Sequence, residues 1–102
     1  MIHVLATIQL AAGRRADFLA EFDKLVPQVH AERGCLEYGP AIDLATPIAA
    51  SAAVREDTVV VVEKWESVQA LRDHLAAPHM ERYREVVKDW VVSVEIRVLE
   101  PV

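Results

Sequence analysis

Hydrophobic and polar residues alternate near both ends of the chain in the pattern of β-strands. Residues 2–10 (IHVLATIQL) place every second side chain, from Ile2 to Leu10, on one apolar face. Residues 90–99 (WVVSVEIRVL) do the same, with an apolar row that runs from Val92 to Val98. Both stretches therefore predict strands with one face toward a core.

Two further strands are expected in the middle of the chain. Residues 58–65 (TVVVVEKW) are largely β-branched and too apolar for exposure on both faces, which indicates a central strand. Residues 35–44 are less regular because Gly39-Pro40 interrupts them, as is typical of an edge or bulged strand. Residues 45–57 (ATPIAASAAVRED) show no clean period, so we expect an extended loop there.

Apolar residues recur at helical spacing in two of the three intervals between these strands. After Arg14, apolar side chains recur at helical spacing, and this predicts a helix to about Arg33 that is weakened or kinked at Pro27. Gly34 suits the position past its end. Ser67 can cap a second helix, which Pro78 breaks or restarts before a further helical piece.

The order β-α-β-β-α-β predicts an α+β fold of the ferredoxin-like, split βαβ kind. Its four-stranded antiparallel sheet carries the helices on one face. Val59 and Val61 lie on one face of the central strand and Val60 and Val62 on the other, so both sheet faces are apolar or mixed. This pattern favours a homodimer that forms through the sheet.

Composition limits the class of protein. With 102 residues, the chain is expected to form one domain over 1–102, and its 53% hydrophobic share leaves apolar surface for a ligand or partner. A net charge of −5 without a basic stripe argues against nucleic acid. The chain shows no signal-like start and no apolar run of membrane-spanning length, so a cytoplasmic protein without a membrane partner is expected. Cys35 is the one cysteine, which excludes an internal disulfide and thiolate clusters.

His74 and His79 are the two histidines that lie close together near the buried stripe of the second helix. Their spacing of five residues does not suit one helix face, and no third ligand is evident, so no metal site is expected. His74 can instead exchange a proton in an apolar pocket. The structural alternative is a histidine at the edge of the core whose ring bonds to a backbone carbonyl.

Glu63 and Trp65 share one face of the central strand. A carboxylate there is costly unless paired, so Glu63 should bond to a donor such as His74 or a loop amide, or orient a catalytic group. Tyr38 and Tyr83 can donate hydrogen bonds to an oxygenated ligand or complete the packing. The three glycines form no phosphate-binding motif, which argues against a nucleotide or flavin cofactor.

Several segments together resemble the antibiotic biosynthesis monooxygenase family, especially its quinol monooxygenase-like members. They are ERGCLEY at 32–38, VEKWES at 62–67, LRDH at 71–74 and PHM at 78–80. The resemblance covers nearly the whole chain, and the order and spacing of the segments make it specific. It implies a dimeric α+β barrel whose pockets bind a quinol or phenolic substrate and add oxygen from dioxygen without metal, flavin or haem.

The resemblance also implies roles for individual residues. Trp65 would wall the pocket or stack on the substrate ring, His74 would assist proton transfer, and Glu63 would hold that arrangement. Tyr38, His79 and Met80 would be neighbours of the substrate in the pocket. Tyr83 joins them as an expected substrate-binding residue because of its hydroxyl, not because of the resemblance.

Two other functions stay open from the sequence. The pocket could sequester an aromatic ligand without turnover, as in a stress-related binding protein. A haem-binding or haem-degrading relative is the other alternative, although residues 2–10 lack the asparagine that such relatives typically carry on the first strand.

Overall fold

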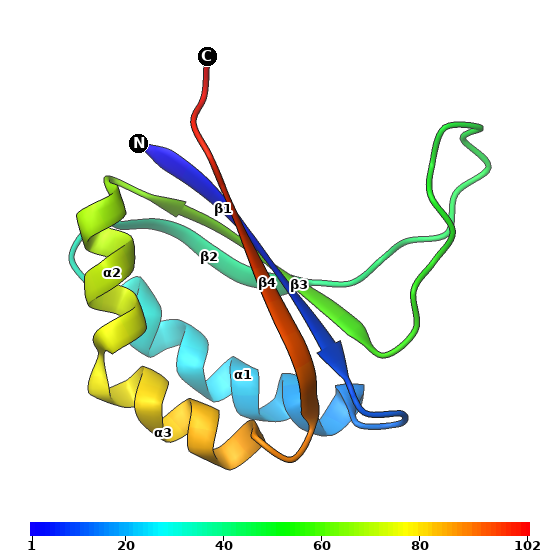
Figure 1. The fold of residues 1–102 in the computed structure, drawn as a ribbon, viewed down its shortest axis with the longest axis horizontal. Coiled ribbons are helices and arrows are strands. Elements are labelled where there is room, and N and C mark those ends of the chain that lie inside the picture. Colours follow the sequence, from blue (N-terminus) through cyan, green and yellow to red (C-terminus); the bar gives the residue numbers. More distant parts are fainter.

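The computed structural model describes residues 1–102 and confirms the predicted ferredoxin-like α+β fold (Figure 1). The elements in chain order are β1 (Ile2–Leu10), α1 (Arg15–His30), β2 (Cys35–Ala41), β3 (Thr58–Trp65), α2 (Val68–Ala76), α3 (Pro78–Val87) and β4 (Val91–Leu99). The strands form one antiparallel sheet in the order β2-β3-β1-β4, and the helices lie on one face of it. Thr58–Trp65 is a central strand and Cys35–Ala41 an edge strand, as predicted.

The second helical segment is two helices because Pro78 starts α3. Ala77 has extended backbone angles, φ −65° and ψ 143°, and ends α2. Pro78 has no N–H to donate and a φ already suited to a helix, so it is well placed in the first turn of α3. At the start of α2, the Ser67 hydroxyl accepts a hydrogen bond from Ala70 N at 3.1 Å, which is the predicted cap.

The core lies between the helices and the inward rows of β1 and β3. Val4 pairs with Glu63 and Ala6 with Val61, so alternate residues of both strands face the helices. The buried residues that fill this layer come from all three helices and from β1, β2 and β3 and include Val4, Ile8, Phe18, Phe22, Leu25, Val29, Val59, Trp65, Leu71 and Val87.

The inward row of β4 differs from the prediction at one position. A bulge between Gln9 and Leu10 pairs Leu10 with Val91, so Val92 leaves the row and is 65% exposed. Val94 and Ile96 keep the predicted face, opposite Ile8 and Ala6, but both are exposed by more than a third. An apolar strip on β4 is therefore left uncovered by the helices.

The helix predicted to reach Arg33 ends at His30, and the strand predicted to reach Leu44 ends at Ala41. The helix stops early because the chain turns there: Glu32 N bonds to Val29 O, and Gly34 takes a positive φ of 85°. The Gly34 carbonyl then accepts from Glu66 N at 2.9 Å, which joins this turn to the end of β3.

The loop predicted over residues 45–57 is confirmed and begins earlier, so that residues 42–57 extend away from the sheet and helices (Figure 1). An ion pair joins its two ends: Arg55 Nε lies 2.9 Å and Arg55 Nη2 3.0 Å from the two oxygens of Asp43. These hydrogen bonds lower the pKa of Asp43 to about 2. None of the three helices has both the length and the apolar character that crossing a membrane requires.

Gly34→Ala should destabilise the fold by about 2 kcal/mol or more, because it combines a left-handed backbone with a steric clash. A Cβ at this position would lie 2.7 Å from Ala70 Cβ. Urea unfolding followed by circular dichroism measures the loss. Gly39→Ala is the control, since a Cβ there meets nothing within 4 Å, and equal losses in the two variants would contradict the explanation.

Candidate functional site

A cavity of about 430 Å³ lies between the sheet and α3. Its walls are mostly apolar, and β4 closes one side with Val94 and Ile96. The polar side chains that border it are Tyr38, Glu63, His74, Tyr83, Arg84 and Lys88. An apolar cavity with a few convergent polar groups is the usual form of a small-molecule site.

His74, in the last turn of α2, borders this cavity although it is only 1% exposed. Its Nδ1 lies 2.9 Å from Glu32 Oε2, and its ring packs against Trp65 with centroids 4.6 Å apart. Burial lowers the pKa of His74, although the hydrogen bond with Glu32 and the charge of that residue act in the opposite direction.

The contact with Glu32 selects the tautomer of His74. An ionised carboxylate only accepts hydrogen bonds, so Nδ1 must carry the proton, and Nε2 keeps a lone pair in the neutral ring. Nε2 has no hydrogen-bond partner within the chain, whereas every buried side-chain nitrogen and oxygen has one. Nε2 is therefore accessible, and because His74 borders the cavity, Nε2 can accept a proton there. The partner of the buried ring is thus a carboxylate rather than a backbone carbonyl.

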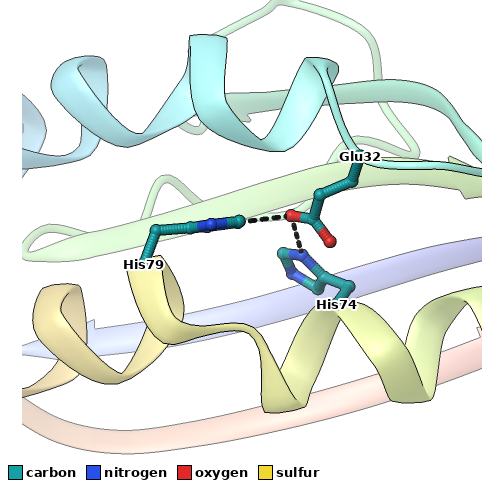
Figure 2. Close-up of side chains that lie close together, drawn as sticks. All are labelled: Glu32, His74 and His79. Carbon is teal, nitrogen blue, oxygen red and sulfur yellow. Dashed lines mark hydrogen bonds and ion pairs between the residues drawn. The ribbon is translucent and has the colours of Figure 1, made fainter.

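Glu32 is the residue of this site that the sequence analysis missed. It follows α1, and its Oε2 also lies 2.7 Å from Nε2 of His79. Figure 2 shows the Glu32 carboxylate in contact with both imidazole rings. The signal that could have found it is strand pairing, because Cys35 pairs with Trp65 and so brings the turn before β2 beside the start of α2.

His79 reaches Glu32 because the chain breaks between α2 and α3. Its spacing of five residues from His74 would separate the rings on a continuous helix, but the extended Ala77 redirects the chain. The ligand atoms of Glu32, His74 and His79 lie within 4.8 Å of one another, so these residues could hold a metal ion. The structure thus places a third possible ligand, Glu32, beside the two histidines, which the sequence did not make evident.

Glu63 is buried on β3, where Trp65 Nε1 donates a hydrogen bond of 2.8 Å to its Oε1. The prediction that His74 or a loop amide donates to Glu63 is wrong. The donor is the indole N–H of Trp65, which lies two residues along the strand on the same face. Burial is the main cause that raises the pKa of Glu63; the bond from Trp65 lowers it and the charge of Glu32 raises it, and the net value is about 7. This carboxyl can therefore change its protonation near neutral pH.

Tyr38, Met80 and Tyr83 also border the cavity. The Tyr38 ring stacks on Phe22 with centroids 5.6 Å apart and meets the His74 ring edge to face. Burial is the main cause that raises the pKa of both tyrosines, so their hydroxyls stay protonated donors.

Two of the predicted site residues do not border the cavity. Trp65 is fully buried behind His74 and Glu63, where it contacts both groups. His79 lies on the far side of Glu32. The structure thus brings Tyr38, Glu63, His74, Met80 and Tyr83 to one cavity and places Trp65 and His79 around their supports.

Glu63→Gln should stabilise the protein at pH 8. The pKa of Glu63 is about 7 in the folded chain, against an ordinary value of 4.5 in the unfolded chain. The folded state therefore favours the protonated form, and this contribution is complete below pH 4.5 and is lost as the pH rises through 7. The difference corresponds to at most about 3 kcal/mol, and glutamine can still accept the Trp65 bond.

Urea unfolding at pH 4, 6 and 8 tests this prediction. The advantage of Glu63→Gln should grow from pH 4 to pH 8, whereas Glu37→Gln, at an exposed glutamate of β2, should show no such growth. A variant less stable than the parent at pH 8 would mean that a contact stabilises the Glu63 anion.

Comparison with known proteins agrees with this architecture. Residues 1–86 match the family described as Antibiotic biosynthesis monooxygenase. The chain is 39% identical over 103 residues to Probable quinol monooxygenase YgiN of Escherichia coli (strain K12), covering 99% of this chain and 98% of that protein. Among solved structures, PA3566 from Pseudomonas aeruginosa is similar with 25% identity and a TM-score of 0.81, over 99% of this chain and 93% of that one. Rv0793 from Mycobacterium tuberculosis is similar with 24% identity and a TM-score of 0.79, over 99% and 94%. As its sequence motifs predict, the chain belongs to the antibiotic biosynthesis monooxygenase family.

Proposed function

We propose that this protein is a cofactor-independent monooxygenase that oxidises a quinol or another polyphenolic aromatic with dioxygen. Membership of the family and a full-length relative named as a probable quinol monooxygenase support the monooxygenase class. The observation that carries the finer proposal is the free Nε2 of His74, a neutral base at the edge of an aromatic-lined cavity.

The cavity suits a flat phenol. Phe22, Tyr38 and Tyr83 supply aromatic walls, and a volume of about 430 Å³ lies within the range of small-molecule pockets. The hydroxyls of Tyr38 and Tyr83 make no hydrogen bond within the chain. Because no buried polar side-chain atom is left unpaired, both hydroxyls are accessible and can donate to the substrate oxygens. His74 Nε2 accepts, so one quinol hydroxyl can bind to the base while donors hold the other oxygen.

Proton removal is the step that the protein supplies in this proposal. His74 takes the phenolic proton, and the resulting quinolate is electron-rich enough to pass one electron to dioxygen. The semiquinone and superoxide then combine to a hydroperoxide, which loses water to give a hydroxylated quinone. The substrate provides all the electrons: one oxygen atom enters the ring and the other leaves as water, so no external reductant is consumed.

The neighbouring groups have supporting roles. Glu32 keeps the His74 proton on Nδ1 and stabilises the imidazolium that forms. Trp65 fixes Glu63 through its indole N–H, and Glu63, with a pKa of about 7, can take up or return a proton during turnover. Met80 contributes an adaptable apolar wall.

His74→Ala should lower the rate of quinol-dependent oxygen uptake by about 10²- to 10⁴-fold, because it removes the general base. Oxygen-electrode measurements with a reduced naphthoquinone give the rate. Added imidazole should restore part of it, which a purely structural role of His74 would not allow. His30→Gln is the control, since His30 is exposed and bonds only to the Tyr38 carbonyl.

Chelator-treated protein is the reference state of this assay, because the proposal needs no metal. Binding of the quinol, seen by tryptophan fluorescence, without oxygen uptake above that of buffer would contradict the proposal and favour the ligand-sequestering alternative. An unchanged rate in His74→Ala would reject this residue as the base.

We further propose that the chain forms a homodimer through the sheet face that carries no helices. Val60 and Val62 lie on this face of β3 beside Leu5 of β1. Val62 is 38% exposed at the middle of the sheet, where a second copy would cover it. Burial of such a patch against its equivalent gives a two-fold symmetric interface.

Val62→Lys should convert the dimer to monomer, because each subunit would bury an ammonium group in the apolar centre of the interface. Sedimentation velocity measures the mass. Val86→Lys on α3 is the matched control, since Val86 is exposed on the opposite side of the molecule. A parent protein that sediments as a monomer would overturn this proposal.

A further inference from the structure

Glu32, His74 and His79 make a cluster that the proposed oxidation does not fully use (Figure 2). We propose that these three residues bind a divalent transition-metal cation with the ligand preference of zinc, and that the bound cation switches His74 from a proton acceptor to a donor. The metal site itself is independent of the proposed function. Its inhibitory consequence rests on that function.

The donor set has the chemistry of a zinc site. Two imidazole nitrogens and one carboxylate oxygen are common zinc ligands, and three protein ligands leave a fourth position for water. The three ligand atoms are Oε2 of Glu32, Nδ1 of His74 and Nε2 of His79. They come from the turn after α1, the end of α2 and the start of α3, so the fold rather than one motif assembles them.

The distances are near those that a metal requires. Zinc bonds of about 2.0–2.2 Å place tetrahedral ligand atoms about 3.4 Å apart. Oε2 lies 2.9 Å and 2.7 Å from the two nitrogens, and all three atoms fall within 4.8 Å. Occupation therefore requires Glu32 to retreat by about half an ångström and the imidazoles to approach each other, which side-chain rotation provides.

The charges around the cluster favour a bound cation, and the exposure of its side chains allows the cation to enter. The negative charge of Glu32 acts on the buried Glu63, so a cation at Glu32 would offset that repulsion. Arg84 opposes this attraction, since its charge reaches His74. The side chains of Glu32 and His79 keep 12% and 17% of their surface exposed, against 2% for His74, so entry is from their side.

The site lies behind His74 as seen from the cavity. Glu32 and His79 do not border the cavity, whereas His74 does. The cation would therefore not touch a substrate in the cavity. It would act through the imidazole ring, which has one nitrogen on each side.

A cation on Nδ1 changes what the ring presents to the cavity. Nδ1 must give up its proton to bind metal, and a neutral ring then carries its proton on Nε2. Nε2–H is a donor and cannot accept a phenolic proton. Under the proposed function, zinc would thus inhibit turnover without competing for the substrate position.

Zinc titration of the chelator-treated protein by calorimetry tests the site directly. We expect one zinc ion per chain in the micromolar range or tighter, with a rise in the melting temperature. Co²⁺ should give the visible absorption bands of a tetrahedral site. In nitrogen-15 correlation spectra, the His74 proton should move from Nδ1 to Nε2 when zinc is added.

Two variants locate the binding. His79→Gln keeps a donor for Glu32, so the fold should survive, and Glu32→Gln removes the anionic ligand; each should weaken zinc binding at least tenfold. His30→Gln should bind as the parent does, which controls for adventitious histidine binding. Circular dichroism verifies that each variant is folded.

The outcomes separate this inference from the proposed function. No zinc uptake at micromolar concentration, or parental affinity in folded His79→Gln, overturns the metal site and leaves the cluster as a hydrogen-bonded anchor, whatever the oxygen-uptake assay gives. Zinc binding with the His74 proton still on Nδ1 overturns the switch. Zinc binding by a protein with no quinol turnover overturns the proposed function alone.

Discussion

One carboxylate oxygen, Oε2 of Glu32, holds two imidazole rings and thereby joins the chain after α1 to both α2 and α3. The polar lining of the cavity depends on this contact, because the apolar walls alone would not fix the orientation of the His74 ring in the last turn of α2. A buried histidine can turn its ring over at small steric cost. The acceptor at Nδ1 removes that freedom, since the reversed ring would leave either the carboxylate or a ring nitrogen without its partner.

The cluster works together with a second pair on β3. Trp65 contacts Glu63 through its indole N–H and His74 through its ring face, so one fully buried side chain supports both ionisable groups of the cavity. The two groups respond to burial in opposite senses, because burial disfavours whichever form is charged. The histidine is therefore kept neutral, while the carboxyl holds its proton to higher pH than usual. An acid and a base with pKa values shifted toward each other are useful to a reaction that only moves protons.

The strands and helices were predictable from the chain because their signals are local. The alternation in 2–10 and the β-branched run in 58–65 specify which faces are buried, and Pro78 specifies where a helix restarts. The bulge at Val91 and Val92 was not predictable, since only the partner strand determines it. The same limit applies to the site. His74, Glu63 and Tyr38 stand out as polar groups in apolar elements, whereas Glu32 precedes a strand in an ordinary polar turn, and its role appears only when β2 pairs with β3.

The ion pair between Asp43 and Arg55 has a consequence for how this fold can vary. It joins the two ends of the loop that extends from the sheet. No residue between Asp43 and Arg55 borders the cavity. Insertion, deletion or exchange of a recognition peptide at this position would add new surface to the molecule and leave the geometry around His74 as it is.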